Sequence, residues 1–263
     1  MLKYCSIGCG SSGNCHVITY KNTGILIDAG LAGKTITSGI KQADFDIDKI
    51  QGIFITHEHS DHIKGAGIMS RKLDIPIYAN LKTWCGMKDK IGNIKEENMV
   101  VFENDRTYVL GDIKIRPFSI PHDSEDAVGY NIYSENEKMS IATDIGYVTE
   151  NIRRNLKGSK LVILESNYDP NMLMMGRYSY SLKKRIMSEG GHLSNEEAAS
   201  FCTELVDGGT ETILLAHLSK DNNFPELAYA TSKNVLTNNQ MIVGKDLMLD
   251  VMSRNKGSKV YKL

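Results

Sequence analysis

Short runs of apolar residues alternate along the chain with stretches in which apolar residues recur every three or four positions. The first pattern predicts β-strands and the second predicts amphipathic helices. The predicted strands cover residues 4–7, 16–20, 24–28, 52–56, 75–79, 100–102, 113–120, 128–133, 139–143, 161–165, 212–216 and 260–263. The predicted helices cover residues 36–43, 62–73, 82–91, 150–157, 171–188, 195–206 and 225–237.

The two halves of the chain share one order of elements. Each half opens with successive strands and then changes to strands that alternate with helices. This order is accounted for by an α/β (α+β) fold in which two mixed β-sheets pack face to face and are flanked by helices, an αββα sandwich. The halves are joined without a low-complexity or Pro/Ser-rich linker, so we expect a single domain over residues 1–263.

Composition and charge narrow the class of protein. Hydrophobic residues make up 41% of the 263 residues, and the formal net charge is −1. This balance does not suggest a nonspecific nucleic-acid coat or a polybasic membrane anchor, although it leaves room for a local basic groove. The sequence shows no signal-peptide core and no membrane span, and its five cysteines lack zinc-knuckle spacing. We therefore expect a cytoplasmic protein with reduced thiols and no membrane contact.

The densest group of chemically active side chains is the segment HEHSDH at residues 57–62, directly after an apolar strand. Three of the seven histidines of the chain lie in it. His57 and His59 are two positions apart on an extended segment, so their side chains point the same way. Asp61 and His62 follow on the first turn of a predicted helix. Imidazole and carboxylate groups at this spacing predict a metal site with two adjacent ions, whereas an exposed loop with incidental histidines leaves the clustering unexplained.

The HxHxDH segment is also the signature of the metallo-β-lactamase superfamily, and four further segments resemble its other motifs in order. They are residues 26–30 (LIDAG), 119–123 (SIPHD), 142–146 (ATDIG) and 214–219 (LLAHLS). The resemblance implies a metallo-β-lactamase fold that holds two divalent metal ions, Zn or Mn, with Fe as a further candidate. The implied ligands are His57, His59, His122 and Asp144 for one ion and Asp61, His62, Asp144 and His217 for the other, with Asp28 steadying the histidine loop.

The chemistry implied by this resemblance is hydrolysis. A pair of divalent cations lowers the pKa of a shared water molecule and braces the oxygens of a phosphodiester during in-line attack. Flavodiiron-type members of the fold carry Glu where this chain has His59, which favours hydrolysis over redox chemistry. Asp61 and His192 are the two candidates for the group that protonates the leaving oxygen, and the sequence does not decide between them.

Longer segments narrow the resemblance to the WalJ/YycJ family of bacterial proteins. They are residues 9–14 (CGSSGN), 27–31 (IDAGL), 190–195 (GGHLSN) and 216–223 (AHLSKDNN). The family is associated with metal-dependent 5′-to-3′ exonuclease activity on DNA, so the resemblance implies a phosphodiester hydrolase whose partner is the phosphate backbone of DNA. The chain is too short for the large inserted domain of β-CASP nucleases such as RNase J, and no obligate protein partner is inferred.

A glycine- and serine-containing loop is the first candidate for contact with that backbone. It consists of Ser11, Ser12, Gly13 and Asn14. Small side chains and open backbone N–H groups beside a strand suit a phosphate. The alternative is an ordinary turn, which uses the same residue types.

Two later segments are further candidates for substrate binding. Ser194 and Asn195 lie at a predicted helix start, which either binds a phosphate or is simply capped by these side chains. Arg177 and Lys184 belong to a basic stretch that contains tyrosines. That stretch either binds DNA by phosphate contacts and base stacking or is a solvated helix face.

Two other functions compete with a nuclease. One is a small-molecule hydrolase of the same fold, such as a cyclic phosphodiesterase, lactonase or thioesterase, for which a closed pocket is expected in place of a wide basic groove. The other is a non-catalytic metal-binding regulator, which the complete set of ligand residues disfavours.

Overall fold

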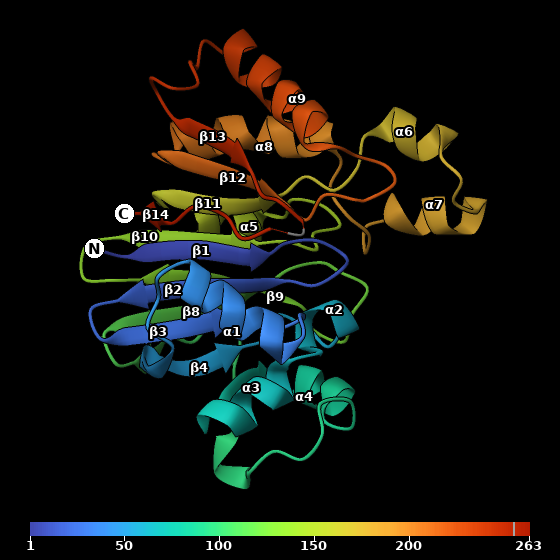
Figure 1. Cartoon of the computed structure of the whole chain (residues 1–263). Coiled ribbons are helices and arrows are strands. Elements are labelled where there is room, and N and C mark those ends of the chain that lie inside the picture. The colour runs from blue at the N-terminus through green and yellow to red at the C-terminus, as the bar shows by residue number, and fades with distance from the viewer. Residues whose placement is uncertain (255) are drawn as a thin grey trace.

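Two seven-stranded β-sheets lie face to face, and helices cover their outer faces (Figure 1). The structure is a computed structural model that describes residues 1–254 and 256–263. In Figure 1 the strands lie between α8 and α9 at the top and α3 and α4 at the bottom. This arrangement confirms the αββα sandwich expected from the sequence.

The first sheet has the strand order β14-β1-β2-β3-β4-β5-β6. Neighbouring strands are antiparallel from β14 to β3 and parallel from β3 to β6. Its strands are β1 (Lys3–Gly8), β2 (Cys15–Tyr20), β3 (Thr23–Ile27), β4 (Ile50–Phe54), β5 (Ile77–Asn80), β6 (Met99–Phe102) and β14 (Tyr261–Lys262).

The second sheet repeats this plan, with the strand order β13-β12-β11-β10-β9-β8-β7. Neighbouring strands are antiparallel from β7 to β10 and parallel from β10 to β13. Its strands are β7 (Tyr108–Leu110), β8 (Ile113–Ser119), β9 (Val128–Tyr133), β10 (Lys138–Ala142), β11 (Leu161–Glu165), β12 (Thr212–Ala216) and β13 (Met248–Val251). Both sheets are therefore mixed.

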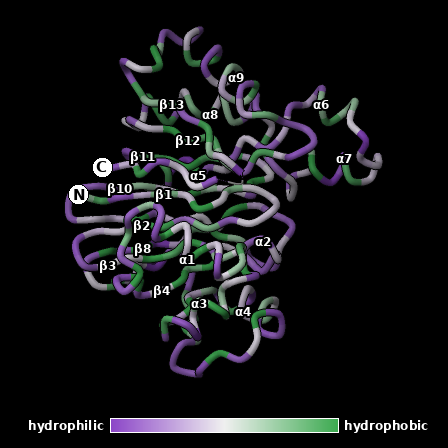
Figure 2. The backbone as a smooth tube through the Cα atoms, in the orientation of Figure 1, coloured by the Kyte–Doolittle hydropathy of each residue, from purple (hydrophilic) through white to green (hydrophobic). Residues whose placement is uncertain are grey.

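Three apolar clusters hold these layers together. The first lies between the sheets and joins Tyr4 of β1 to Tyr130 of β9. The second packs α5, α8 and α9 on the second sheet, and the third packs α1, α3 and α4 on the first. In Figure 2 the hydrophobic colour accordingly follows the strands.

The helices are α1 (Gly33–Gln42), α2 (Ser60–Ile63), α3 (Ala66–Leu73), α4 (Leu81–Met87), α5 (Glu150–Leu156), α6 (Pro170–Met175), α7 (Tyr180–Ile186), α8 (Asn195–Asp207) and α9 (Pro225–Asn238), with short 3-10 helices at Ile47–Lys49 and Glu96–Asn98.

Two of the predicted helices are wrong as continuous elements. Residues 62–73 are divided between α2 and α3 at Gly65, where a Cβ atom would lie 2.1 Å from the carbonyl oxygen of Leu31. Residues 171–188 are divided between α6 and α7. The second of these begins anew because the Ser179 side chain accepts a hydrogen bond from the Leu182 N–H.

The edge strands β7 and β13 are additions to the predicted set. β7 has three residues and β13 has four, so neither gives a clear alternating pattern. Within residues 1–254 and 256–263, the helices are too short or too polar to span a membrane.

Candidate metal centre

The histidine loop follows β4 and is held by a carboxylate from the end of β3. The Thr56 backbone N–H donates a 2.8 Å hydrogen bond to Asp28 Oδ1, and His62 Nδ1 lies 2.7 Å from Asp28 Oδ2. Because Asp28 engages Nδ1, the other ring nitrogen of His62 is left for the cluster, where it lies 3.6 Å from Asp61 Oδ2. Asp28 thus contacts both the start of the histidine loop and His62, which is compatible with the supporting role expected from its motif.

The second sheet brings three more candidate ligands to the same place. His122 follows β8, Asp144 follows β10 and His217 follows β12. The Asp144 carboxylate lies between the two halves: its Oδ2 is 3.5 Å from His62 Nε2, and its Oδ1 is 3.5 Å from His217 Nε2 and 3.8 Å from His122 Nε2. Residues far apart in the sequence therefore meet where the ends of strands from both sheets converge.

Potential ligand atoms form several overlapping sets in the described part of the chain, and within each set all atoms lie within 4.8 Å of one another. The sets are His57, His59 and His122; His57, His62 and Asp144; Asp61, His62 and His217; and Asp144, Glu165, His192 and His217. Every ligand expected from the sequence occurs in at least one set.

The chemistry of this cluster fits divalent metal ions. Asp144 Oδ2 and His217 Nε2 are buried and have no hydrogen-bond partner among the described residues. Buried polar atoms nearly always have a partner, and coordination of a cation would provide one for both. Imidazole and carboxylate donors are ligands typical of divalent transition metals.

Glu165, the last residue of β11, is a site residue that the sequence analysis missed. Its side chain is fully buried, and its Oε1 lies 2.9 Å from both His192 Nδ1 and His217 Nδ1. Its Oε2 accepts hydrogen bonds from the backbone N–H groups of Ile145 and Leu193. Glu165 thus supports His217 as Asp28 supports His62. The available signal was an acidic residue that ends an otherwise apolar strand, since a buried glutamate is rare unless it is paired.

Burial and the nearby carboxylates divide the histidines into two electrostatic classes. Burial lowers the pKa of His57 well below its usual value, which favours the neutral form that binds metal. Burial also opposes charge on His62 and His192. The carboxylates beside them, led by Asp28 and Glu165 respectively, outweigh it and raise the pKa to about 10 for His62 and about 9 for His192. A metal ion that binds His62 therefore competes with a proton.

The backbone at the centre is strained and closely packed. Asp28, Asp144 and His217 have φ angles of 59°, 60° and 56°, in the left-handed region that non-glycine residues seldom adopt. Such conformations persist where the surrounding structure enforces them, often at functional sites. At Gly30 a Cβ atom would lie 1.6 Å from the carbonyl oxygen of Asp61, so only glycine allows the loop after β3 to approach α2 this closely.

The candidate phosphate loop, residues 11–14, lies beside the metal centre, but part of it already makes hydrogen bonds within the protein. Gly13 N–H donates to the Gly10 carbonyl and Asn14 N–H to the Asp61 carbonyl. The Asn14 side chain is buried, with Nδ2 3.0 Å from His62 Nε2. Ser11 and Ser12 are exposed, and Ser11 lines a cavity next to His192.

The candidate residues at the start of α8 make internal contacts. The Ser194 hydroxyl accepts a hydrogen bond from the Glu197 N–H, and the Glu197 carboxylate accepts one from the Ser194 N–H, which completes a capping box. Asn195 is buried, and its amide bonds to Ser166 and Asn223. These contacts match the capping alternative for Ser194.

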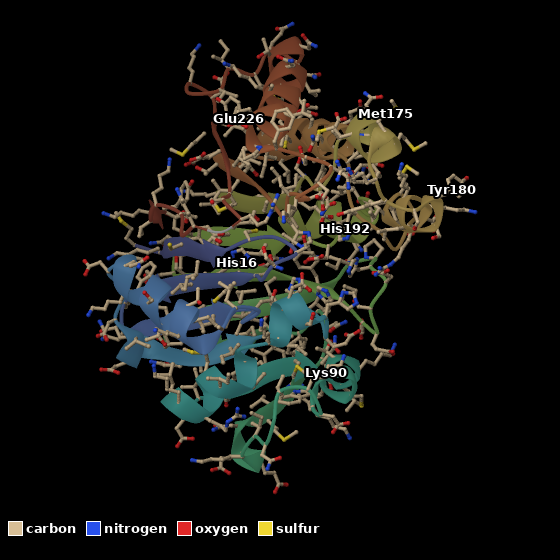
Figure 3. All side chains as sticks on the ribbon, turned by 45° about the vertical axis from the view of Figure 1, so that its right-hand side comes forward. His16, Lys90, Met175, Tyr180, His192 and Glu226 are labelled. Atoms are coloured by element: carbon tan, nitrogen blue, oxygen red, sulfur yellow. The ribbon has the colours of Figure 1, made fainter. Side chains whose placement is uncertain are left out.

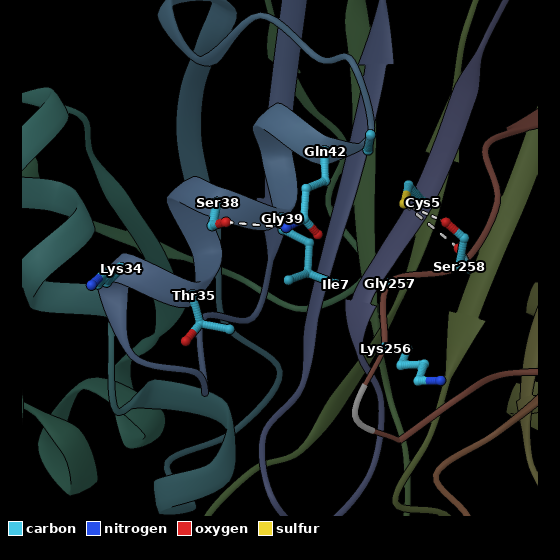
Figure 4. Close-up of a pocket in the computed structure, with 11 residues that line it drawn as sticks. Cys5, Ile7, Lys34, Thr35, Ser38, Gly39, Gln42, Lys256, Gly257 and Ser258 are labelled. Atoms are coloured by element: carbon cyan, nitrogen blue, oxygen red, sulfur yellow. Dashed lines mark hydrogen bonds between the residues drawn. The ribbon is translucent and has the colours of Figure 1, made fainter.

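The remaining candidates lie on the segment that carries α6 and α7. Arg177 and Lys184 are both exposed. Tyr178 and Arg185 of the same segment line the cavity next to His192, which has a volume of about 190 Å³. A larger cavity, of about 640 Å³, lies between α1, β1 and the C-terminal residues 256–258 (Figure 4). The cavity next to His192 adjoins the candidate ligand His217.

Comparison with known proteins agrees with this geometry. Residues 23–218 match the family described as "Beta-lactamase superfamily domain". The chain is 41% identical over 244 residues to "Exodeoxyribonuclease YycJ" of Bacillus anthracis, covering 93% of this chain and 92% of the relative. It is 37% identical over 246 residues to "Exodeoxyribonuclease WalJ" of Streptococcus pneumoniae (strain D39), covering 93% and 91%.

A solved structure shares the whole fold. The metallo-β-lactamase fold protein YhfI from Bacillus subtilis superposes with a TM-score of 0.74 at 15% identity, covering 100% of both chains. The structural match shows a shared fold, and the matches in amino-acid sequence show a closer family relationship. The chain therefore belongs to the metallo-β-lactamase superfamily and, within it, to the WalJ/YycJ family.

Proposed function

We propose that the protein is a metal-dependent phosphodiester hydrolase, a DNA exonuclease that works in the 5′-to-3′ direction with two divalent ions, Zn or Mn. The observation that carries the proposal is the convergence of imidazoles and carboxylates from both sheets around Asp144, whose Oδ2 is buried without a hydrogen-bond partner among the described residues. Relatives named exodeoxyribonucleases that align over nearly the whole chain support DNA as the substrate.

The ligand sets proposed for the two ions share Asp144. When bound, such a pair of ions supplies an acidified water molecule and balances the charge that develops on a phosphodiester. The chain's own residues orient the site: Asp28 and Glu165 hold His62 and His217 by their Nδ1 atoms. The proposed ligands are His57, His59, His122 and Asp144 for one ion and Asp61, His62, Asp144 and His217 for the other.

We assign proton transfer to the leaving oxygen to His192 in preference to Asp61. Glu165 holds His192 by Nδ1, and the His192 ring is partly exposed at the wall of the 190 Å³ cavity. Asp61 groups with His62 and His217 as a candidate ligand and, unlike His192, is also one of the ligands implied by the metallo-β-lactamase motifs. A positioned histidine that carries a proton is a common general acid.

The proposal extends to the organisation and setting of the chain. The cluster between the sheets draws on residues of both halves, which supports a single domain over residues 1–263 without a β-CASP insertion. The free cysteines support a cytoplasmic setting. The exposed Arg177 and Lys184, with Ser11 and Ser12, are the proposed contacts to the DNA backbone.

A small phosphodiester is the second candidate substrate. The volume of the cavity beside His192 is below the roughly 300–1,000 Å³ that is usual for drug-sized ligands, so the cavity suits a smaller one.

Metal-free protein reloaded with Mn²⁺, Zn²⁺ or Mg²⁺ should be assayed on end-labelled, 5′-phosphorylated DNA and on a chromogenic phosphodiester. We expect stepwise products from the 5′ end that depend on metal. Hydrolysis of the small ester alone would favour the second candidate.

The matched variants are Asp144→Asn and Asp112→Asn. Asp112 is an exposed turn residue that accepts hydrogen bonds from Asn22 and Thr23, which an asparagine oxygen can also do. We expect Asp144→Asn to lose more than about 100-fold in rate, since even residues that only support metal ligands are worth about 10–100-fold. Asp112→Asn should match the wild type. Full activity of Asp144→Asn would refute the assignment of the centre.

A further inference from the structure

A helical hairpin stands over one side of the candidate metal centre. Residues 168–191 lie within the connection between β11 and α8, carry α6 and α7, and project beyond the sheets (Figure 1). In Figure 3 Met175 and Tyr180 lie on the projecting part, whereas His192 lies inward of it. We call residues 168–191 the α6–α7 hairpin.

The hairpin is tied to two loops that carry candidate ligands. The Tyr178 hydroxyl donates a 2.8 Å hydrogen bond to Asp221, in the loop after His217. The Arg185 guanidinium pairs with Asp123, the residue after His122. The Asp123 N–H also donates to the Gly190 carbonyl at 2.9 Å. The hairpin therefore bridges the second-sheet side of the centre, from the His122 loop to the His217 loop.

Four of the candidate ligands differ in their exposure to solvent. The side chains of His122, Asp144 and His217 are 2%, 4% and 3% exposed, whereas that of Asp61 is 23% exposed. Asp61 belongs to the histidine loop of the first sheet. Asp61 is therefore the most exposed of these four candidate ligands.

The 190 Å³ cavity lies between the hairpin and the centre. Leu182 and Ile186 of α7 line it together with His192 and His217. A volume of about 190 Å³ is below the roughly 300–1,000 Å³ of pockets that hold drug-sized ligands. Such a space has room for one terminal group of a strand, and α7 lines it through Leu182, Arg185 and Ile186.

We propose that the α6–α7 hairpin is the specificity determinant that restricts hydrolysis to strand ends. This inference rests on the proposed nuclease function and adds to it the residues that select an end. The strand enters past Asp61, its terminal group occupies the cavity beside His192, and α7 excludes a continuing chain. The Tyr178–Asp221 and Arg185–Asp123 contacts hold the hairpin in this position.

The test compares a linear single-stranded DNA with a covalently closed circle of the same sequence. The wild type should hydrolyse the circle at least about 100-fold more slowly than the linear strand. In the double variant Tyr178→Phe/Arg185→Met, which removes both contacts, the circle-to-linear rate ratio should rise at least tenfold. An unchanged ratio in the double variant, or a wild type that cuts both substrates equally, would overturn the inference.

A matched control removes the same kinds of contact elsewhere. Tyr261 donates a 2.8 Å hydrogen bond to Asp250, and Arg153 pairs with Glu204 at 2.8 Å. Tyr261→Phe/Arg153→Met should keep the wild-type ratio; a tenfold rise there as well would show that general loosening, and not the hairpin, sets the ratio, which counts against the inference.

A second variant tests the cavity independently of the contacts that hold the hairpin. Leu182→Trp fills the space beneath α7, so digestion of the linear strand should fall at least tenfold while metal affinity, measured by titration calorimetry, stays at the wild-type value. Unchanged digestion would contradict a role for the cavity. A wild type that hydrolyses neither the linear strand nor the circle would refute the proposed nuclease function itself. Failure of the proposed function can therefore be distinguished from failure of the inference about the hairpin.

Discussion

Two buried carboxylates lie behind the histidines of the metal centre, one from each sheet. Asp28 follows β3 and contacts His62 Nδ1, and Glu165 ends β11 and contacts His217 Nδ1. Each fixes which ring nitrogen faces the ligand cluster. The site strongly favours the charged form of Glu165. Burial alone would raise the pKa of this carboxyl group, but His192 and His217 lower the pKa to about 2. At the residue scale, we therefore expect metal binding to depend on these two carboxylates as well as on the ligands themselves.

The variant Glu165→Gln tests that dependence. It keeps the side-chain volume but removes the charge that faces two imidazoles, so we expect metal affinity to fall about 10–100-fold. Titration calorimetry of the metal-free protein measures it. Glu204→Gln, in which an exposed glutamate loses its pairing with Arg153, is the matched control and should bind metal normally. Equal affinities for the two variants would show that Glu165 does not support the centre.

The difference between Asp28 and Glu165 shows what a sequence reveals at this scale. Asp28 stands in a recognisable motif, whereas Glu165 ends a strand whose preceding residues are all apolar. Its function depends on Ile145, Leu193 and two histidines from other segments, and such a convergence is set by the tertiary fold. Local pattern therefore indicated the ligand loops but missed the group that orients one of them.

At the element scale, the helix starts determine where candidate residues point. The 13-residue helix α8 begins with the capping box of Ser194 and Glu197. We expect Ser194→Ala to lower the free energy of unfolding by about 1 kcal/mol, because an N-cap hydroxyl satisfies an otherwise unpaired N–H. Denaturant unfolding checks this, with Ser200→Ala, an exposed position on the same helix, as the control that should change stability little. A raised KM for DNA with unchanged stability would instead favour phosphate binding at Ser194.

Sequence patterns identified most elements but not the breaks between them. The αββα order followed from strands and helices whose apolar spacing is regular. The α6–α7 hairpin was hidden inside one apparent helix, because a serine cap at Ser179 also fits a helix interior in sequence. The turn between α6 and α7 depends on contacts with a distant part of the chain. At Gly176, for example, a Cβ atom would lie 2.6 Å from Asn222 Oδ1. The exposed positions of Arg177 and Lys184 depend on that turn.

At the scale of the whole molecule, the metal centre joins the two sheets. The histidine loop belongs to the first sheet, whereas His122, Asp144 and His217 follow strands of the second. Without a cation, Asp144 Oδ2 and His217 Nε2 are buried polar atoms lacking a partner among the described residues, which opposes close packing of the halves. Metal ions should therefore stabilise the fold as well as supply chemistry.

Metal removal tests this coupling. A ligand that binds only the folded state adds RT ln(1 + [L]/Kd) to its stability, about 4 kcal/mol at a thousandfold excess over Kd. We expect chelation to lower the Tm by several degrees and readdition of Zn²⁺ or Mn²⁺ to restore it in proportion to the logarithm of metal concentration. Calorimetric scans of Asp144→Asn should show a much smaller metal-dependent rise, whereas Asp112→Asn should show the full rise. If the Tm of the wild type did not change with metal concentration, metal binding would not contribute to the stability of the fold. The contacts between the two sheets would then be stable without a cation at the centre.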